Sequence, residues 1–169
     1  MPTNLLKKYN ALLELAALNE HQRIASLKGV FSRDIIENKN FKFRLKQIKP
    51  TTADGEDSME RLFRHLTTCI TDKTTQHREF EMARSMRLHW IRHHVEERKL
   101  DNMYVFSVDE PRSGIRTYIY DSDENYVIVL EPLRNGSDYY LLTAYYLEGK
   151  DAARNKMMKK YKRRLPYLA

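Results

Sequence analysis

The sequence predicts an α+β protein: N-terminal helices are followed by a helix-plus-four-stranded antiparallel sheet domain with a basic C-terminal helix. Before Leu100 the apolar residues recur at helical spacing, whereas after it β-branched and aromatic residues form four short segments separated by turn residues. The stretch 150–164 then has eight basic residues in fifteen positions, with Met157, Met158 and Tyr161 at near-helical intervals.

The first fifty residues are expected to be mainly helical. Apolar residues recur at helical spacing from Asn4 to Leu27, which predicts an amphipathic helix capped by Asn4. Residues 30–48 are interpreted as a short helix and an alternating, strand-like segment. Residues 51–58 are small, acidic and rich in turn formers, so we predict a helical region 1–50, a linker 51–58 and an α+β domain 59–169.

The second half of the chain contains the predicted domain. One helix is expected from Asp57 or Ser58 to about Ile70, and another from about Arg78 to Arg98. Turn signals such as Asn135-Gly136 separate the strand segments, and such short connections imply an antiparallel meander. The four predicted strands are Met103–Val108, Ile115–Tyr120, Tyr126–Glu131 and Tyr139–Leu147.

Composition favours an anionic partner. The net charge is +7 and the pI is near 9.4, and lysines and arginines that neutralise phosphates gain affinity through counterion release. We find neither an apolar stretch of about 18 residues nor the apolar core of a signal peptide. A single cysteine, Cys69, allows no intrachain disulfide and suits a reducing compartment. The prediction is a cytoplasmic protein without membrane association.

The second predicted strand presents polar and aromatic residues on one face. Two-residue alternation places Arg116, Tyr118 and Tyr120 together. A guanidinium forks onto phosphate and tyrosine rings stack on bases, so this face suits RNA. Glu131, which ends the next strand, is interpreted as a general base or, preferably, as the ion-pair partner of Arg116.

The last predicted strand offers a second group of polar residues. Alternation places Tyr139, Thr143 and Tyr145 on one face and Tyr140 and Tyr146 on the other, and the sequence leaves open which face is buried. The structural alternative is that these tyrosines are core and rim residues of a small sheet.

The helix predicted around residue 90 is dense in groups that bind or protonate a phosphate. Arg84 and Arg87 share a face, as do His89 and His93. The histidine spacing also fits a metal clamp, but no third ligand accompanies it, so no metal site is predicted. A solvated basic face is the alternative for the arginines.

The sequence contains no glycine-rich phosphate loop, nucleophile elbow, paired-cysteine zinc motif or dinucleotide fingerprint. Four motifs, in this order, resemble phage- and prophage-associated nuclease domains of the barnase, EndoU, colicin and RelE-like ribonuclease superfamily. The resemblance covers residues 78–164, about half of the chain. The motifs are Arg84-x-x-Arg87-x-x-Trp90-Ile91, Ile115–Tyr120, Tyr126–Glu131 and Tyr140–Tyr146.

The resemblance implies a metal-independent endoribonuclease of the toxin or effector type. Such an enzyme cleaves tRNA or mRNA by attack of the ribose 2′-hydroxyl on the adjacent phosphate and needs no cofactor. The matching positions imply that Arg87, Arg116, Thr143 and Tyr145 are catalytic. Relatives often use a histidine or a Lys/Glu pair as acid and base, and His89 is the candidate here. The expected substrate-binding residues are Arg84, Tyr118, Glu131, Lys150, Lys156 and Lys160.

Two other functions stay open. The chain can be a non-catalytic RNA- or DNA-binding module of a phage or toxin–antitoxin system, in which tyrosines and the basic C-terminal segment bind bases and backbone. It can also be an interaction protein that binds a partner through its N-terminal amphipathic helix. Besides RNA, the partners considered are a cognate inhibitor or antitoxin protein and a second copy of the chain, packed through that N-terminal helix.

Overall fold

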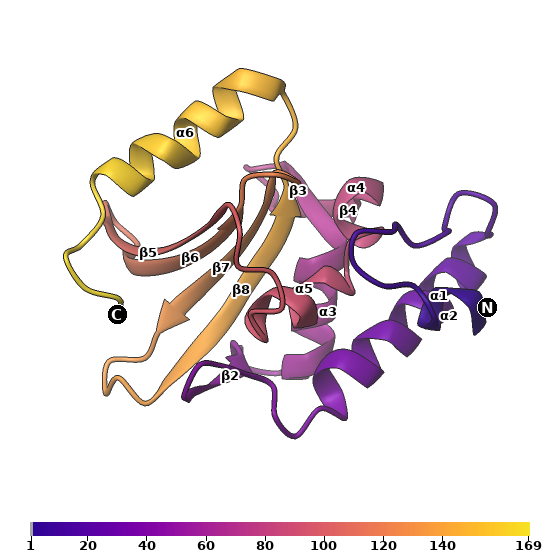
Figure 1. Ribbon diagram of the computed structural model, residues 1–169. Coiled ribbons are helices and arrows are strands. Elements are labelled where there is room, and N and C mark those ends of the chain that lie inside the picture. Colours follow the sequence, from indigo (N-terminus) through magenta and orange to yellow (C-terminus); the bar gives the residue numbers. More distant parts are fainter. Residues whose placement is uncertain (1) are drawn as a thin grey trace.

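The computed structural model describes residues 2–169, except for the side chains of residues 2 and 150–154. The fold is α+β: N-terminal helices, a six-stranded, mostly antiparallel curved sheet and a C-terminal helix (Figure 1). The sheet strands are β1 (Lys42–Phe43), β2 (Lys46–Pro50), β5 (Met103–Glu110), β6 (Gly114–Asp121), β7 (Tyr126–Pro132) and β8 (Asp138–Tyr146). The helices are α1 (Pro2–Leu5), α2 (Glu20–Phe31), the π-helix η1 (Ser32–Ile36), α3 (Ser58–Thr67), α4 (Met82–Ser85), α5 (Trp90–Val95) and α6 (Lys150–Lys162).

The meander predicted from the sequence is confirmed as β5 to β8. These strands pair antiparallel in chain order, and the Asn135-Gly136 turn between β7 and β8 uses Gly136 at φ +70°, where a side chain would be strained. The prediction of four strands was incomplete, because β1 and β2 extend the sheet beyond β8 in the order β1-β2-β8-β7-β6-β5. The β2–β8 pair is parallel.

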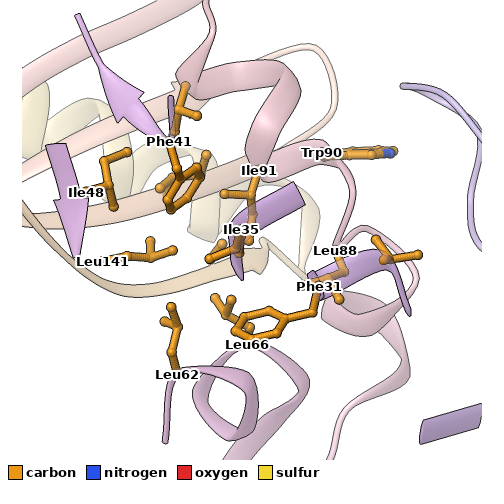
Figure 2. Packing of buried hydrophobic residues seen from close by; sticks show 14 of the residues in the cluster. Phe31, Ile35, Phe41, Ile48, Leu62, Leu66, Leu88, Trp90, Ile91 and Leu141 are labelled. Atoms are coloured by element: carbon orange, nitrogen blue, oxygen red, sulfur yellow. The ribbon is translucent and has the colours of Figure 1, made fainter. Parts of the chain in front are cut away.

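Both faces of the sheet are covered, which gives the molecule three layers (Figure 1). One face packs against α2, η1, α3 and α5, and Figure 2 shows Phe31, Leu66, Ile91 and Leu141 among the side chains of this core. The other face packs against α6 through a smaller cluster in which Met157 meets Phe106 and Val127. Alternation along each strand supplies one set of apolar side chains to each cluster, and full burial of such a side chain stabilises the fold by about 1.5–3 kcal/mol.

The predicted helix from Asn4 to Leu27 was wrong. Residues 6–18 form a loop because Asn4, only 1% exposed, is not a cap but a buried clamp: its side-chain amide binds the backbone N–H and carbonyl of Glu14 at 2.8 and 3.1 Å. This loop inserts Leu13 and Leu15 into the main core. The helix α2 starts later, where Asn19 and Gln22 form a capping box.

The predicted helix from Arg78 to Arg98 was also wrong. Residues 68–80 form a β-hairpin of β3 (Thr68–Asp72) and β4 (His77–Phe80), and α4 and α5 follow as separate short helices. The backbone carbonyl of Met86 accepts a hydrogen bond from the N–H of Leu13 at 3.0 Å, and that acceptor is the one a continuous helix would offer to Trp90. A tertiary contact thus replaces the helical bond.

The segment 51–58 connects β2 to α3, which starts at Ser58 as expected, and Asp57 caps it by accepting from the N–H of Glu60 at 3.0 Å. The residues before it do not form a purely helical region: β1 and β2 belong to the sheet, and Leu27, Phe43 and Ile48 share one core with Leu66.

Candidate functional site

A cleft of about 400 Å³ lies beside the second half of β8. On β8 the strand β2 pairs only with Asp138–Leu141, so beyond Leu141 the outer edge of β8 meets α3 and α4 instead of another sheet strand, and the β3–β4 hairpin completes the cleft. The walls of the cleft come from α3, β3, β4, α4 and β8. The side chains that line the cleft belong to His65, Cys69, Ile70, Arg78, Arg84, Leu142, Thr143 and Tyr145.

The hairpin folds back onto α3 through Thr67, the last residue of that helix. The backbone carbonyl of Thr67 accepts from the N–H of Glu81 at 2.9 Å and from the hydroxyl of Ser85 at 3.1 Å. These bonds fix the start of α4 against the end of α3, and Arg84 on α4 therefore reaches the edge of β8.

Arg84 lines the cleft and contacts residues of α3 and β8. Its Nη1 donates to the Oγ1 of Thr143 at 3.1 Å and to the backbone carbonyl of His65 at 2.9 Å, and its Nε donates to Glu81 at 2.6 Å. The guanidinium carbon lies 6.0 Å from the ring centroid of Tyr145. Arg84, Thr143 and Tyr145 thus form one group, held in place by fixed donors and acceptors.

The electrostatics of the cleft are dominated by arginine. Arg78 donates from Nε to the Oγ1 of Thr68 and from Nη2 to its carbonyl, both at 2.8 Å, and its pKa is lowered by burial and by the charge of Arg84. Burial also lowers the pKa of His65 to about 4, helped by Arg78 and by Arg61 and Arg64 on α3. The imidazole of His65 is therefore neutral at pH 7 and surrounded by positive charge.

A row of polar groups continues from the cleft across the same face of the sheet. Burial raises the pKa of Tyr145, so its hydroxyl stays protonated at neutral pH. Its neighbour Tyr118 donates a hydrogen bond at 2.7 Å to Glu110, which also pairs with Lys160 and with Arg163 of the C-terminal segment. Lys160, expected to bind substrate, is thus engaged in an ion pair.

Three of the sequence-predicted residues meet in the cleft: Arg84, Thr143 and Tyr145. Tyr139, predicted to share a strand face with Thr143 and Tyr145, lies on the opposite face of the sheet, in the main core. The reason is a shift of register, since Leu141 pairs with Leu130 but Thr143 pairs with Val129.

Arg116 and Glu131 lie on the same sheet face but outside the cleft. They form the expected ion pair, with 3.6 Å between Arg116 Nη1 and Glu131 Oε2. Arg116 is on β6, two strands from Thr143, and strand spacing alone separates their backbones by about 10 Å. Arg116 is therefore not among the residues that line this cleft.

Arg87 and His89 point away from the cleft as well. The guanidinium of Arg87 stacks on the ring of Tyr146 at 3.9 Å, and its Nη1 donates to the carbonyl of Ala83 at 2.6 Å. His89 is 5% exposed and lies against the N-terminal segment, near the backbone of Lys8. The predicted helix is broken into α4 and α5, so Arg84 lines the β8 cleft whereas Arg87 and His89 do not.

The basic helix α6 lies over the smaller cluster. Lys156 is exposed on it, whereas the side chain of Lys150 lies outside the described residues. In the described part of the chain, no group of three or more histidine, cysteine, aspartate or glutamate side chains is placed to hold a metal ion.

Sequence reasoning did not assign His65, Cys69 or Arg78 to the site. The run Thr68-Cys69-Ile70-Thr71 followed by Asp72-Lys73 is typical of a strand and a turn, and this signal could have revealed the hairpin that returns Arg78 to α3. Burial and the nearby carboxylate of Glu81 raise the pKa of Cys69, so its thiol is not an activated nucleophile.

Comparisons with protein-family models, with curated proteins and with solved structures found no match for this chain. Among the described residues, none of the helices has the length and apolar character required to cross a bilayer.

Proposed function

We propose that the chain binds single-stranded RNA in the β8 cleft and cleaves it without a metal ion. The observation that supports this most is the contact of Arg84 with Thr143 beside Tyr145, in a cleft that also contains Arg78 and a neutral histidine. Arginine and hydroxyl donors bind phosphate, and tyrosines on an adjoining sheet face offer stacking surfaces for bases.

The residue types supply each step of a transesterification. The ribose 2′-oxygen attacks the adjacent phosphorus, while the neutral imidazole of His65 accepts the 2′-hydroxyl proton. Arg78 and Arg84 stabilise the negative charge that develops on the phosphorane oxygens, and Thr143 positions Arg84 by accepting a hydrogen bond from its Nη1. The bond from phosphorus to the 5′-oxygen then breaks, and the Tyr145 hydroxyl protonates the leaving oxygen. The products are a 2′,3′-cyclic phosphate and a 5′-hydroxyl end.

A pair of tyrosine variants tests this assignment. Total RNA is incubated in EDTA with the wild type, with Tyr145→Phe and with Tyr146→Phe, and the new ends are mapped and tested for cyclic phosphate. Tyr145→Phe removes the proton donor, so we expect cleavage to fall roughly 10²-fold or more. Tyr146→Phe is the matched control because Tyr146 is the next residue of β8 and faces Arg87 on the other side. Equal activity in both variants would overturn the role of Tyr145.

A second function is favoured by one feature of the site. The carbonyl of His65 accepts hydrogen bonds from both Arg84 and Thr143, so the Thr143 O–H and one Arg84 N–H are already used within the protein, which favours binding without chemistry. If RNA stays intact in EDTA but binds in a salt-sensitive way, the chain is a non-catalytic RNA-binding module that uses the same cleft.

A further inference from the structure

A second cleft, of about 470 Å³, lies on the N-terminal part of the molecule and takes no part in the proposed cleavage. Its walls come from residues 5–9, from η1 and from α5, and its lining includes His89. We call it the His89 cleft. His89 is 5% exposed, and neither of its ring nitrogens has a hydrogen-bond partner of good geometry.

The unpartnered imidazole is an unusual feature of this cleft. Burial lowers the pKa of His89 to about 4, although the nearby backbone of Lys8 and Ala11 acts in the opposite direction. The ring is therefore neutral at pH 7, with one N–H and one bare lone pair. A buried polar atom without a partner costs about 1–3 kcal/mol, and a ligand that supplies the missing partner would recover this free energy.

The charge of the lining favours an anion. Five basic residues line the cleft against two acidic ones, Asp34 and Glu96. Both acids are already engaged. The buried Asp34 pairs with Arg33 at 2.7 Å. Glu96 pairs with Arg92 at 3.1 Å and with Arg98 at 2.8 Å. The basic residues are Lys7, Lys8, Arg33, Arg92 and Arg98.

The wall next to His89 is flat and aromatic. The rings of Tyr9 and His93 stack with their centroids 4.4 Å apart and their planes 16° apart. Both residues are half-buried and line the same cleft. A planar group attached to the anion would find a surface of matching shape there.

We propose that the His89 cleft binds a phosphate monoester, with the phosphoryl group against His89, Lys8 and Arg92. A bound phosphate favours the imidazolium form, in which one ring N–H donates to the phosphate and the other to a backbone carbonyl of the Lys8–Ala11 segment, so both nitrogens are satisfied. The phosphate belongs to a free nucleotide or to the 5′ end of an RNA strand, which share this chemistry.

The first test uses inorganic phosphate and the carbon-bound ring protons of the histidines, followed by NMR and assigned with single histidine variants. We expect the His89 signal to move with phosphate and its titration midpoint to rise from about 4 by about one pH unit or more. His65 reports separately on the β8 cleft. A His89 signal that ignores phosphate, whatever His65 does, overturns the proposal.

The second test compares charge-matched variants. Lys8→Gln/Arg92→Gln should weaken phosphate binding at His89 about tenfold, since it removes two charged donors. Lys8→Gln alone should weaken it to a lesser degree, and this variant guards against a fold effect because Lys8 is exposed. The control Lys28→Gln/Arg44→Gln removes the same charge outside the cleft and should leave binding unchanged. Equal weakening in the control and the test variant contradicts a specific site.

Two further ligands identify the source of the phosphate. Adenosine monophosphate that binds as tightly as a 5′-phosphorylated oligonucleotide indicates a free nucleotide. Tighter binding of the oligonucleotide, lost when its 5′-phosphate is removed, indicates an RNA end. Binding of neither ligand at His89 contradicts the proposal.

Discussion

At the scale of single residues, two histidines with lowered pKa values serve different clefts. His65 lies beside Arg78 and Arg84, whereas His89 lies in the N-terminal cleft. From the sequence we assigned acid–base chemistry to His89 because it adjoins Arg87 in the resembling motif. Spacing along the chain does not reveal that the helix breaks between α4 and α5, so the choice between the two histidines depended on the tertiary structure.

The pH profile of cleavage tests the role of His65. A general base acts in its deprotonated form, so activity should be lost as the pH falls through the pKa of His65. In the free protein this pKa is about 4, so kcat/KM should stay level from neutral pH down to about pH 5 and fall below it. Bound phosphate partly offsets the arginine charge, which should move the fall in kcat to higher pH.

The comparison variant is His65→Gln, measured over the same pH range. We expect it to lose most activity at every pH and to lose this acid limb. An acid limb near the ordinary histidine value of about 6.5 in kcat/KM would contradict the assignment.

At the scale of elements, β5 to β8 could be predicted because apolar alternation and turn residues agree there. The β3–β4 hairpin was missed because its residues are mostly polar and exposed. Its strands therefore lack the alternation of apolar and polar residues that marks a half-buried strand. The sequence predicted a strand-like segment near β1 and β2 but not its place in the sheet: β2 pairs with β8 across about 90 residues, and no local pattern encodes such a contact. The hairpin and β2 determine where the cleft lies.

The attachment of α6 to the sheet depends on Glu110. Burial alone would raise the pKa of this carboxyl, but hydrogen bonds from Lys160, Tyr118 and Arg163 lower it to about 2. Because the folded pKa lies below the unfolded one, this stabilisation is complete above about pH 4.5 and is lost as the pH falls towards 2. Glu110→Gln should therefore lower the free energy of unfolding by roughly 1–3 kcal/mol at pH 7.

The control for this prediction is Asp109→Asn, which changes the neighbouring, exposed carboxylate on the other side of β5. Urea unfolding at pH 7 and pH 3 measures both variants. The difference between Glu110→Gln and the wild type should shrink at pH 3. A difference that is independent of pH would mean that the ion pairs do not stabilise α6.

At the scale of the whole molecule, the sheet lies between two helical layers, with α2, η1, α3 and α5 on one face and α6 on the other. The fold class could be predicted from composition and periodicity. The linker predicted at 51–58 is a connection between β2 and α3, and a turn-rich sequence has the same composition in a connection of this kind as in a linker between domains. Asp121 on β6 shows how closely the parts are joined: it accepts hydrogen bonds from Tyr9 at 2.5 Å and from His94 on α5 at 2.8 Å. The N-terminal segment and α5 are therefore both joined to the sheet at β6.

The route of RNA over the molecule is the central claim, and the β8 cleft competes with the exposed lysines of α6 for it. Binding of a 2′-O-methyl RNA, which lacks the attacking hydroxyl, isolates affinity from cleavage. We compare Arg78→Gln/Arg84→Gln with Lys156→Gln/Lys159→Gln, two variants that lose equal charge.

Fluorescence anisotropy across a range of salt concentrations measures the affinity of each protein for this RNA. The account predicts that the cleft variant loses affinity and that the slope of log affinity against log salt shrinks by about 0.7 for each lost phosphate contact, while the α6 variant keeps the wild-type slope. A cleft variant with unchanged slope, together with an α6 variant whose slope falls, would contradict the account and place the RNA on the C-terminal helix.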